Sequence, residues 1–196
     1  MAEKNREIEK IIQDILLKEL ALPVKYGEED GYIIPTVYIV SPNVKLGSTD
    51  KMQIGIQSIG ARIISSHSRC EDRNDEYTEI KELVVNDNIQ IDIQSRNDDA
   101  RIRRFEVIAA LESVYAKQMQ EAWSCRIFEI PQGFTNISSA EGSSQLYRYS
   151  ITIAVQYTRV YTQTVSYYNQ FPIEGSIDDL QNTKSFVVDK DFEPFK

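Results

Sequence analysis

The sequence has a single histidine, His67, and two cysteines, Cys70 and Cys125, that lie far apart in the chain. One histidine excludes metal sites built on histidine pairs, and a serine–histidine–aspartate triad would depend on a residue in a polar, serine-rich segment. The cysteines form no CxxC motif, so we expect both to be small buried hydrophobic residues. The sequence contains no GxxxxGK(S/T) or GxGxxG motif that would indicate a phosphate-binding site. The sequence therefore predicts a protein that is not an enzyme and has no cofactor or metal.

Long apolar runs and an excess of basic residues are also missing. No stretch approaches the roughly 20 apolar residues that span a bilayer, and the charged start MAEKNREIEK lacks a signal-peptide core. We therefore expect synthesis in the cytoplasm and no membrane association. The formal net charge is -8, with 30 acidic residues against 22 lysines and arginines. Specific binding of nucleic acid is not expected from this balance. Arg101, Arg103 and Arg104 form the one basic cluster.

Hydrophobic periodicity predicts a helix over residues 3–20, ended by Pro23. Its apolar residues recur every three or four positions: Ile8, Ile11, Ile12, Ile15, Leu16 and Leu20. Alternation of apolar and polar residues predicts strands over 35–42, 52–64, 82–96, 126–131 and 147–165. The polar segments 25–32 and 135–144 are predicted loops, and 66–79 is a predicted exposed loop or hairpin tip.

Residues 98–124 are predicted to form one helix, roughly 40 Å long at ~1.5 Å per residue, with Ser95 or Asn97 capping its first turn. Its broad apolar stripe is expected to be buried against the sheet: Ile102, Phe105, Ile108, Ala109, Tyr115, Met119 and Trp123. The order helix, strands, helix, strands predicts an α+β fold. We expect an antiparallel or mixed β-sheet with a long helix packed on one face, an N-terminal helix and a C-terminal extension.

The chain length and apolar content favour a single domain over residues 1–171, followed by a C-terminal arm over residues 172–196. The arm combines acidic residues with apolar ones of the kind that add a strand to a partner or fill its pocket. The candidate partner-interface residues are Phe186, Val187, Val188, Phe192 and Phe195. Folding back of this segment as an edge strand of its own domain is the alternative.

The stretch from about Glu82 to Tyr168 resembles the tail terminator, or tail completion, proteins of long-tailed bacteriophages, in particular contractile ones. The segments that carry the resemblance are IQIDIQSRNDDA, RRFEVIAALESVYAKQMQE, RIFEIP and RYSITIAVQYTRVY. A strand ending in Ser95-Arg96-Asn97 leads directly into a helix, and a later strand begins at Arg148 and alternates to its end. Residues 43–80 lie outside this stretch, and whether they form a partner-binding loop is left open.

The resemblance implies a structural virion protein whose homohexameric ring caps the tail tube and joins the tail to the neck and head. Its implied partners are other copies of itself, the tail tube and sheath proteins, and neck or connector proteins. DNA would pass through the lumen without specific binding, which suits the net charge of -8. Two alternatives remain: a head-closure or other neck connector protein, and a small hydrolase or effector with an unrecognised site.

Overall fold

The computed structural model describes residues 7–29, 32–40, 50–73, 76–128, 130–141, 144–165, 174–179 and 182–187. Contacts within the chain group it into two compact units. The first unit comprises Met1–His67 and Glu82–Val160, and the second comprises Ser68–Lys81 and Tyr161–Lys196. The predicted boundary between domain and arm, at residues 171 and 172, lies outside the described residues and stays a prediction.

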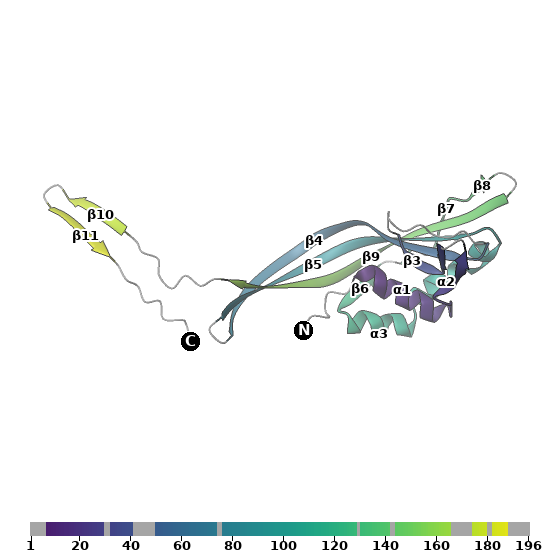
Figure 1. Ribbon diagram of the computed structural model, residues 1–196, viewed down its shortest axis with the longest axis horizontal. Helices are drawn as coiled ribbons and strands as arrows, with labels where there is room; N and C mark the ends of the chain where they lie inside the picture. Colours follow the sequence, from purple (N-terminus) through teal and green to yellow (C-terminus); the bar gives the residue numbers. More distant parts are fainter. Residues whose placement is uncertain are drawn as a thin grey trace. The chain divides into compact units, whose positions relative to one another are not determined.

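The first unit is built on one mixed β-sheet with the strand order β3-β4-β5-β9-β6 (Figure 1). Strand β3 pairs in parallel with β4, whereas β6 and two short strands, β7 and β8, pair antiparallel with β9. The strands span Val37–Ile39 (β3), Gln53–Arg73 (β4), Glu76–Ser95 (β5), Cys125–Phe128 (β6), Thr135–Asn136 (β7), Ser139–Glu141 (β8) and Ser144–Val165 (β9). This arrangement confirms the α+β class and the mixed sheet.

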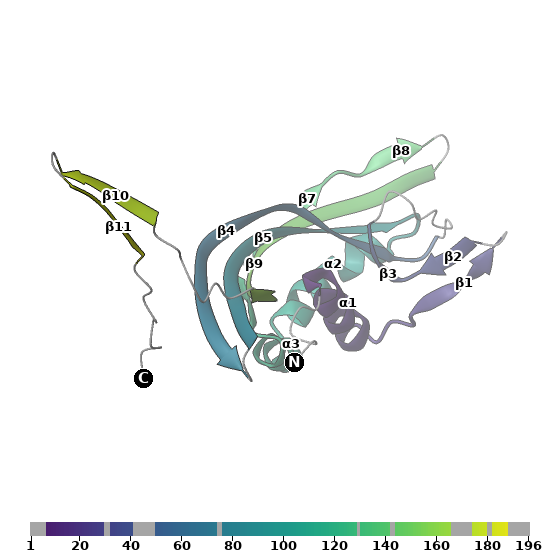
Figure 2. The same ribbon diagram turned by 60° about the vertical axis from the view of Figure 1, so that its left-hand side comes forward.

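Three helices lie on the same side of the sheet, as Figures 1 and 2 show. They are α1 (Ile8–Glu19), α2 (Asp99–Leu111) and α3 (Val114–Ala122). Helix α1 contacts α2, α3 and strand β3, and α3 also contacts β6. No helix among the described residues is long and apolar enough to cross a membrane.

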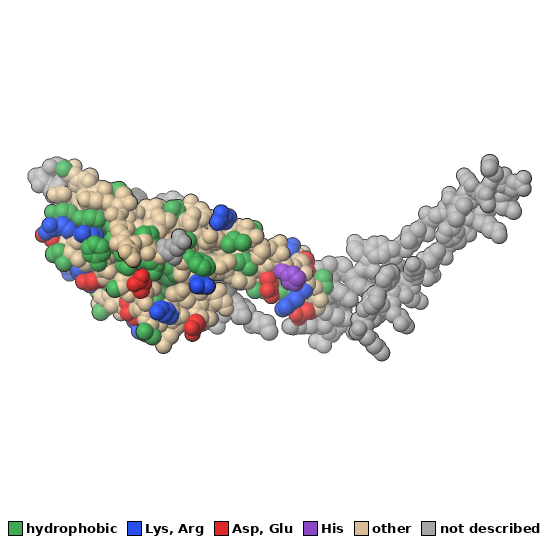
Figure 3. Space-filling model, turned by 180° about the vertical axis from the view of Figure 1, so that it is seen from behind, with side chains coloured by type: hydrophobic (Ala, Val, Ile, Leu, Met, Phe, Trp, Pro, Cys, Tyr) green, Lys and Arg blue, Asp and Glu red, His purple; other side chains and the backbone are tan. Residues whose placement is uncertain are grey.

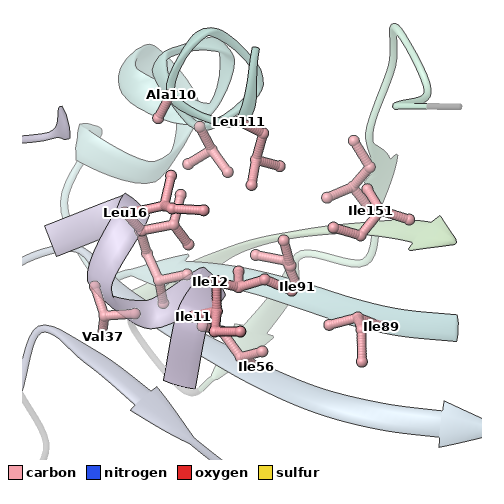
Figure 4. Close-up of a cluster of buried hydrophobic side chains, with 14 of the residues drawn as sticks. Ile11, Ile12, Leu16, Val37, Ile56, Ile89, Ile91, Ala110, Leu111 and Ile151 are labelled. Carbon is pink, nitrogen blue, oxygen red and sulfur yellow. The ribbon is translucent and has the colours of Figure 1, made fainter. Parts of the chain in front are cut away.

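The core forms where α1 faces the central strands (Figure 4). All six apolar residues expected to be buried in the first helix are indeed buried. The alternating isoleucines of the strands face them: Ile54 and Ile56 on β4, Ile89, Ile91 and Ile93 on β5, and Ile151 and Ile153 on β9. Burying one such side chain contributes about 1.5–3 kcal/mol, so this seam stabilises the fold strongly.

The prediction of one long helix over residues 98–124 is wrong, because the segment forms α2 and α3 with a break between them. Ser113 has an extended backbone, with φ -63° and ψ 163°, and its hydroxyl accepts a hydrogen bond from the amide of Ala116 at 3.0 Å. This N-cap satisfies an amide at the start of α3 and begins a new helix there. The N-cap residue of α2 is Asp98, whose side chain makes no capping hydrogen bond. Ser95 and Asn97 still bond to amides of the first turn as expected, since Ser95 Oγ accepts from the amide of Ala100 at 2.9 Å and Asn97 Oδ1 accepts from that of Asp99 at 3.0 Å.

The predicted burial of the whole apolar stripe is also wrong. Phe105 is 52% exposed and Ile102 is 67% exposed, and Ala109 is exposed as well. Smaller residues and one leucine make the buried face of α2: Ala100, Val107, Ala110 and Leu111. The remaining members of the stripe, Ile108, Tyr115, Met119 and Trp123, are partly buried against the core. Helix α2 carries apolar residues on two faces, and the face with the larger side chains points outward.

Polar segments that were predicted as loops form strands. Residues 25–32 fall in a hairpin of β1 (Lys25–Glu29) and β2 (Tyr32–Pro35), and β7 and β8 lie within 135–144. Strands β4 and β5 also extend through most of the predicted tip at 66–79. Strand pairing satisfies backbone amides and carbonyls whatever the side chains are, so exposed polar strands show no apolar period.

The two cysteines differ in burial. Cys125 is buried, and burial raises the pKa of its thiol to about 11. Cys70 is exposed on β4, so the expectation that both cysteines are buried is wrong for this one. An exposed strand position lets a small side chain face solvent without any packing requirement.

The second unit contains the ends of β4 and β5 together with β10 (Glu174–Asp179) and β11 (Asn182–Val187). Strands β10 and β11 form an antiparallel two-stranded sheet in which Glu174 lies opposite Val187. Of the five candidate interface residues, Phe186 and Val187 lie in β11. Val188, Phe192 and Phe195 lie outside the described residues.

Truncating a buried side chain of α1 tests how much the contact between α1 and the sheet contributes to stability. Leu16 has no exposed surface, so Leu16→Ala should lower the free energy of unfolding by about 2–5 kcal/mol through lost burial and a residual cavity. The control is Val114→Ala, because Val114 is 72% exposed and its truncation should change stability by less than about 0.5 kcal/mol. Urea denaturation of both variants gives the comparison, and equal stabilities would contradict the placement of this core.

Candidate interaction surfaces

Apolar and basic side chains gather on one side of α2, where Arg101, Ile102 and Phe105 are exposed and Arg104 and Phe134 are partly buried. We name this group the α2 surface and define it as Arg101, Ile102, Arg104, Phe105 and Phe134. The rings of Phe105 and Phe134 meet edge to face, with centroids 6.1 Å apart and planes at 74°. Ile102 lies one helical turn before Phe105, so the two side chains share a face.

Arg104 stands at the centre of the α2 surface. Its guanidinium lies 4.5 Å from the ring centre of Phe105 and 4.8 Å from that of Tyr149, a buried residue of β9. It also donates a hydrogen bond to the carbonyl of Arg101. Arg101 and Arg103 pair with Asp98 and Glu106, but no carboxylate among the described residues pairs with Arg104.

This composition is typical of protein interfaces. The exposed ring of Phe105 lies beside Arg104, which has no ion pair among the described residues. Aromatic and arginine side chains of this kind contribute most binding energy when a partner covers them. The rings also hold the guanidinium in place, so its charge is presented at a fixed position. The α2 surface is therefore suited to bind a segment that offers both carboxylates and apolar side chains.

A second exposed surface lies on β4, which we name the β4 edge and define as residues 58–67. Strand β3 pairs with β4 only from Ile54 to Ile56, and the amide of Val40 donates to the carbonyl of Ile56 at 2.8 Å. Every residue from 58 to 67 is exposed, including Ile59, Ile63 and Ile64 at 50%, 62% and 53%. Among the described residues no strand continues the sheet beyond this part of β4. Such an edge offers backbone groups and apolar side chains together.

The helix-free face of the sheet carries an ion pair between neighbouring strands. Arg148 of β9 donates to Asp92 of β5 at 3.0 Å. Burial acts to raise the pKa of Asp92, but hydrogen bonds from Gln90, Ser150 and Arg148, together with the charge of Arg148, hold that pKa below its ordinary value of 3.8. Arg148 also has a buried Nε without a hydrogen-bond partner. Arg148 was expected to begin a strand, whereas β9 begins at Ser144; the pair joins Arg148 to the neighbouring strand β5.

The residues considered for catalysis are not brought together. His67 is exposed on β4, and Figure 3 shows the histidine at the surface. It lies in a strand, whereas the sequence predicted a loop there. Among the described residues, no group of three or more histidine, cysteine, aspartate or glutamate side chains is placed to hold a metal ion.

Sequence reasoning missed the α2 surface because it assigned Ile102 and Phe105 to the core. A signal was present, since Arg101, Arg103 and Arg104 interrupt the same apolar stretch. Three arginines within four residues are costly to bury without partners, and this favours an exposed helix face. The basic cluster noted in the sequence and the misassigned apolar residues belong to one surface.

No protein-family model matches the chain, and no curated protein matches it.

Truncation of Phe105 separates a surface role from a core role. A core phenylalanine would cost about 3–5 kcal/mol on truncation to alanine. Because Phe105 is 52% exposed and its ring meets the ring of Phe134 and the guanidinium of Arg104, Phe105→Ala should lower the free energy of unfolding by only about 1 kcal/mol. Thermal and urea unfolding measure this difference, with Leu16→Ala as the core reference. A loss as large as that of the reference would refute the exposed placement.

The lowered pKa of Asp92 predicts a pH-dependent contribution to stability. The pKa is lower in the folded chain, so the stabilisation is fully present above about pH 5 and is lost as pH falls through the folded pKa. The difference in unfolding free energy between wild type and Asp92→Asn should therefore shrink between about pH 5 and pH 2. In an Arg148→Met background the same substitution should show a weaker pH dependence. A constant difference in the wild-type background would contradict the assignment.

Proposed function

We propose that this chain is a structural subunit of a long-tailed bacteriophage particle that assembles into a ring at the head-proximal end of the tail tube. The ring would cap the tube and join it to the neck. The observation that carries the proposal is the presence of two different exposed apolar surfaces, the α2 surface and the β4 edge, on one compact unit.

Two unlike surfaces favour head-to-tail association. In a ring each subunit binds its neighbour through one patch on one side and a different patch on the other, and rotation closes the series. Helix α2 and the exposed part of β4 lie well apart along the first unit, as Figure 1 shows. A subunit of this kind can therefore bind two neighbours at once.

The charge of the chain fits such a ring. A net charge of -8 keeps free subunits apart and gives a lumen that repels the DNA backbone. The sequence resemblance over residues 82–168 supplies the tail-terminator assignment, and its helix–strand order agrees with α2, α3, β6 and β9. A neck connector would share these properties, so the position in the particle needs its own test.

Native mass spectrometry of the full chain tests the ring. Wild type should form a closed oligomer, with six copies expected from the resemblance. Ile63→Lys places a charge on the β4 edge and should shift the protein towards smaller species, because an edge lysine opposes pairing with another chain. Val114→Lys is the matched control, since Val114 is an apolar residue 72% exposed on α3 and lies outside both surfaces. A monomeric wild type at micromolar concentration would count against the ring.

The position in the particle is tested with a phage whose copy of this gene is disrupted. A tail terminator predicts filled heads and separate tails in electron micrographs, with tail tubes of abnormal length. Supplying the wild-type chain from a plasmid should restore joined particles. Tubes of normal length with leaking heads would instead identify a head-closure protein.

A further inference from the structure

The C-terminal segment of the sequence complements the α2 surface in charge and in aromatic side chains. Residues 188–196 read VDKDFEPFK, which combines three carboxylates, those of Asp189, Asp191 and Glu193, with Phe192 and Phe195 and has fewer lysines than acidic residues. The α2 surface offers the opposite set: Arg104, which has no carboxylate partner among the described residues, lies beside the exposed ring of Phe105 and the partly buried ring of Phe134.

The charges make a contact between copies selective. Two copies that each carry a net charge of -8 repel each other at long range. Electrostatic attraction between such copies arises where a basic surface of one copy meets an acidic segment of the other. On the described residues the arginines 101, 103 and 104 form the basic stretch of α2, and two of the three are already neutralised by Asp98 and Glu106. Arg104 is the cation that remains to be paired.

We infer that residues 188–196 of one copy bind the α2 surface of the next copy in the ring. In this contact a carboxylate of the segment pairs with Arg104, and Phe192 and Phe195 cover Ile102, Phe105 and Phe134. The inference rests on the proposed ring and names the contact between its subunits. It also assigns a binding site to the arm residues Phe192 and Phe195.

The chemistry of the contact is consistent at each point. The guanidinium of Arg104 lies against two aromatic rings, and its N–H groups that are not used in the hydrogen bond to the carbonyl of Arg101 can bind a carboxylate. A phenylalanine that covers this pair removes it from water, which strengthens the attraction. The partner is a short segment, so its binding requires no change in the fold of the first unit.

Charge reversal on each side of the contact provides the test, with full-length chains throughout. One variant carries Arg101→Glu and Arg104→Glu, and the other carries Asp189→Lys, Asp191→Lys and Glu193→Lys. Each variant alone should assemble at least about tenfold more weakly than wild type, because like charges then face each other. A 1:1 mixture should recover rings in which the two variants alternate, since every contact again joins opposite charges. Size-exclusion chromatography with light scattering and native mass spectrometry measure both effects.

Lys117→Glu is the matched control for the surface variant. Lys117 is exposed on α3 and lies outside the α2 surface, so this charge reversal should leave assembly unchanged. Unfolding transitions of every variant establish that the folds are intact. A third chain that combines both sets of reversals should assemble by itself.

The outcomes separate this inference from the proposed function. A wild-type chain that stays monomeric contradicts the ring itself. Wild-type rings with equally stable rings from each folded variant leave the ring standing and overturn the contact. Recovery by the combined chain without recovery in the mixture shows binding within one chain, which also overturns the contact between copies. Recovery in the mixture is the result that supports it.

Discussion

Burial of the isoleucine and leucine face of α1 against the central strands is the interaction on which the rest of the structure depends. Helix α1 contacts β3 on one side and α2 and α3 on others, so it links the sheet to the remaining helices. The position of α1 explains which face of α2 is buried. Because α1 occupies much of the helix-bearing face of the sheet, α2 packs through Ala100, Val107, Ala110 and Leu111, and its larger apolar side chains remain outside. The interaction that holds the fold together also creates the surface available to a partner.

The ion pair between Arg148 and Asp92 complements this core from the opposite face of the sheet. It joins two neighbouring strands, β9 and β5, whose apolar residues make much of the seam with α1. A one-residue slip between these strands would exchange the faces of their side chains. The pair would then be lost along with the isoleucine contacts, so the charged and apolar interactions select the same register.

The parts of the fold that local periodicity describes were predictable from the sequence. The spacing in α1 predicts only a helix, and the alternation through Ile89, Ile91 and Ile93 predicts only a strand, because each segment has a single apolar face. Helix α2 has two apolar faces, and choosing between them requires knowing that α1 already covers the sheet. The break before α3 had a signal in Ser113, but a serine also occurs inside helices. The polar strands β1, β7 and β8 had no signal in the sequence, since they are defined by backbone pairing alone.

The β4 edge has a consequence for how such a protein can change over evolutionary time. Contacts made along a strand edge use backbone amides and carbonyls. The side chains at such an edge need only favour an extended backbone. Substitutions among Val, Ile and Thr over residues 58–67 would therefore leave the contact in place. A subunit joined to its neighbours in this way keeps its architecture while its sequence drifts, and the residues that must stay fixed are few.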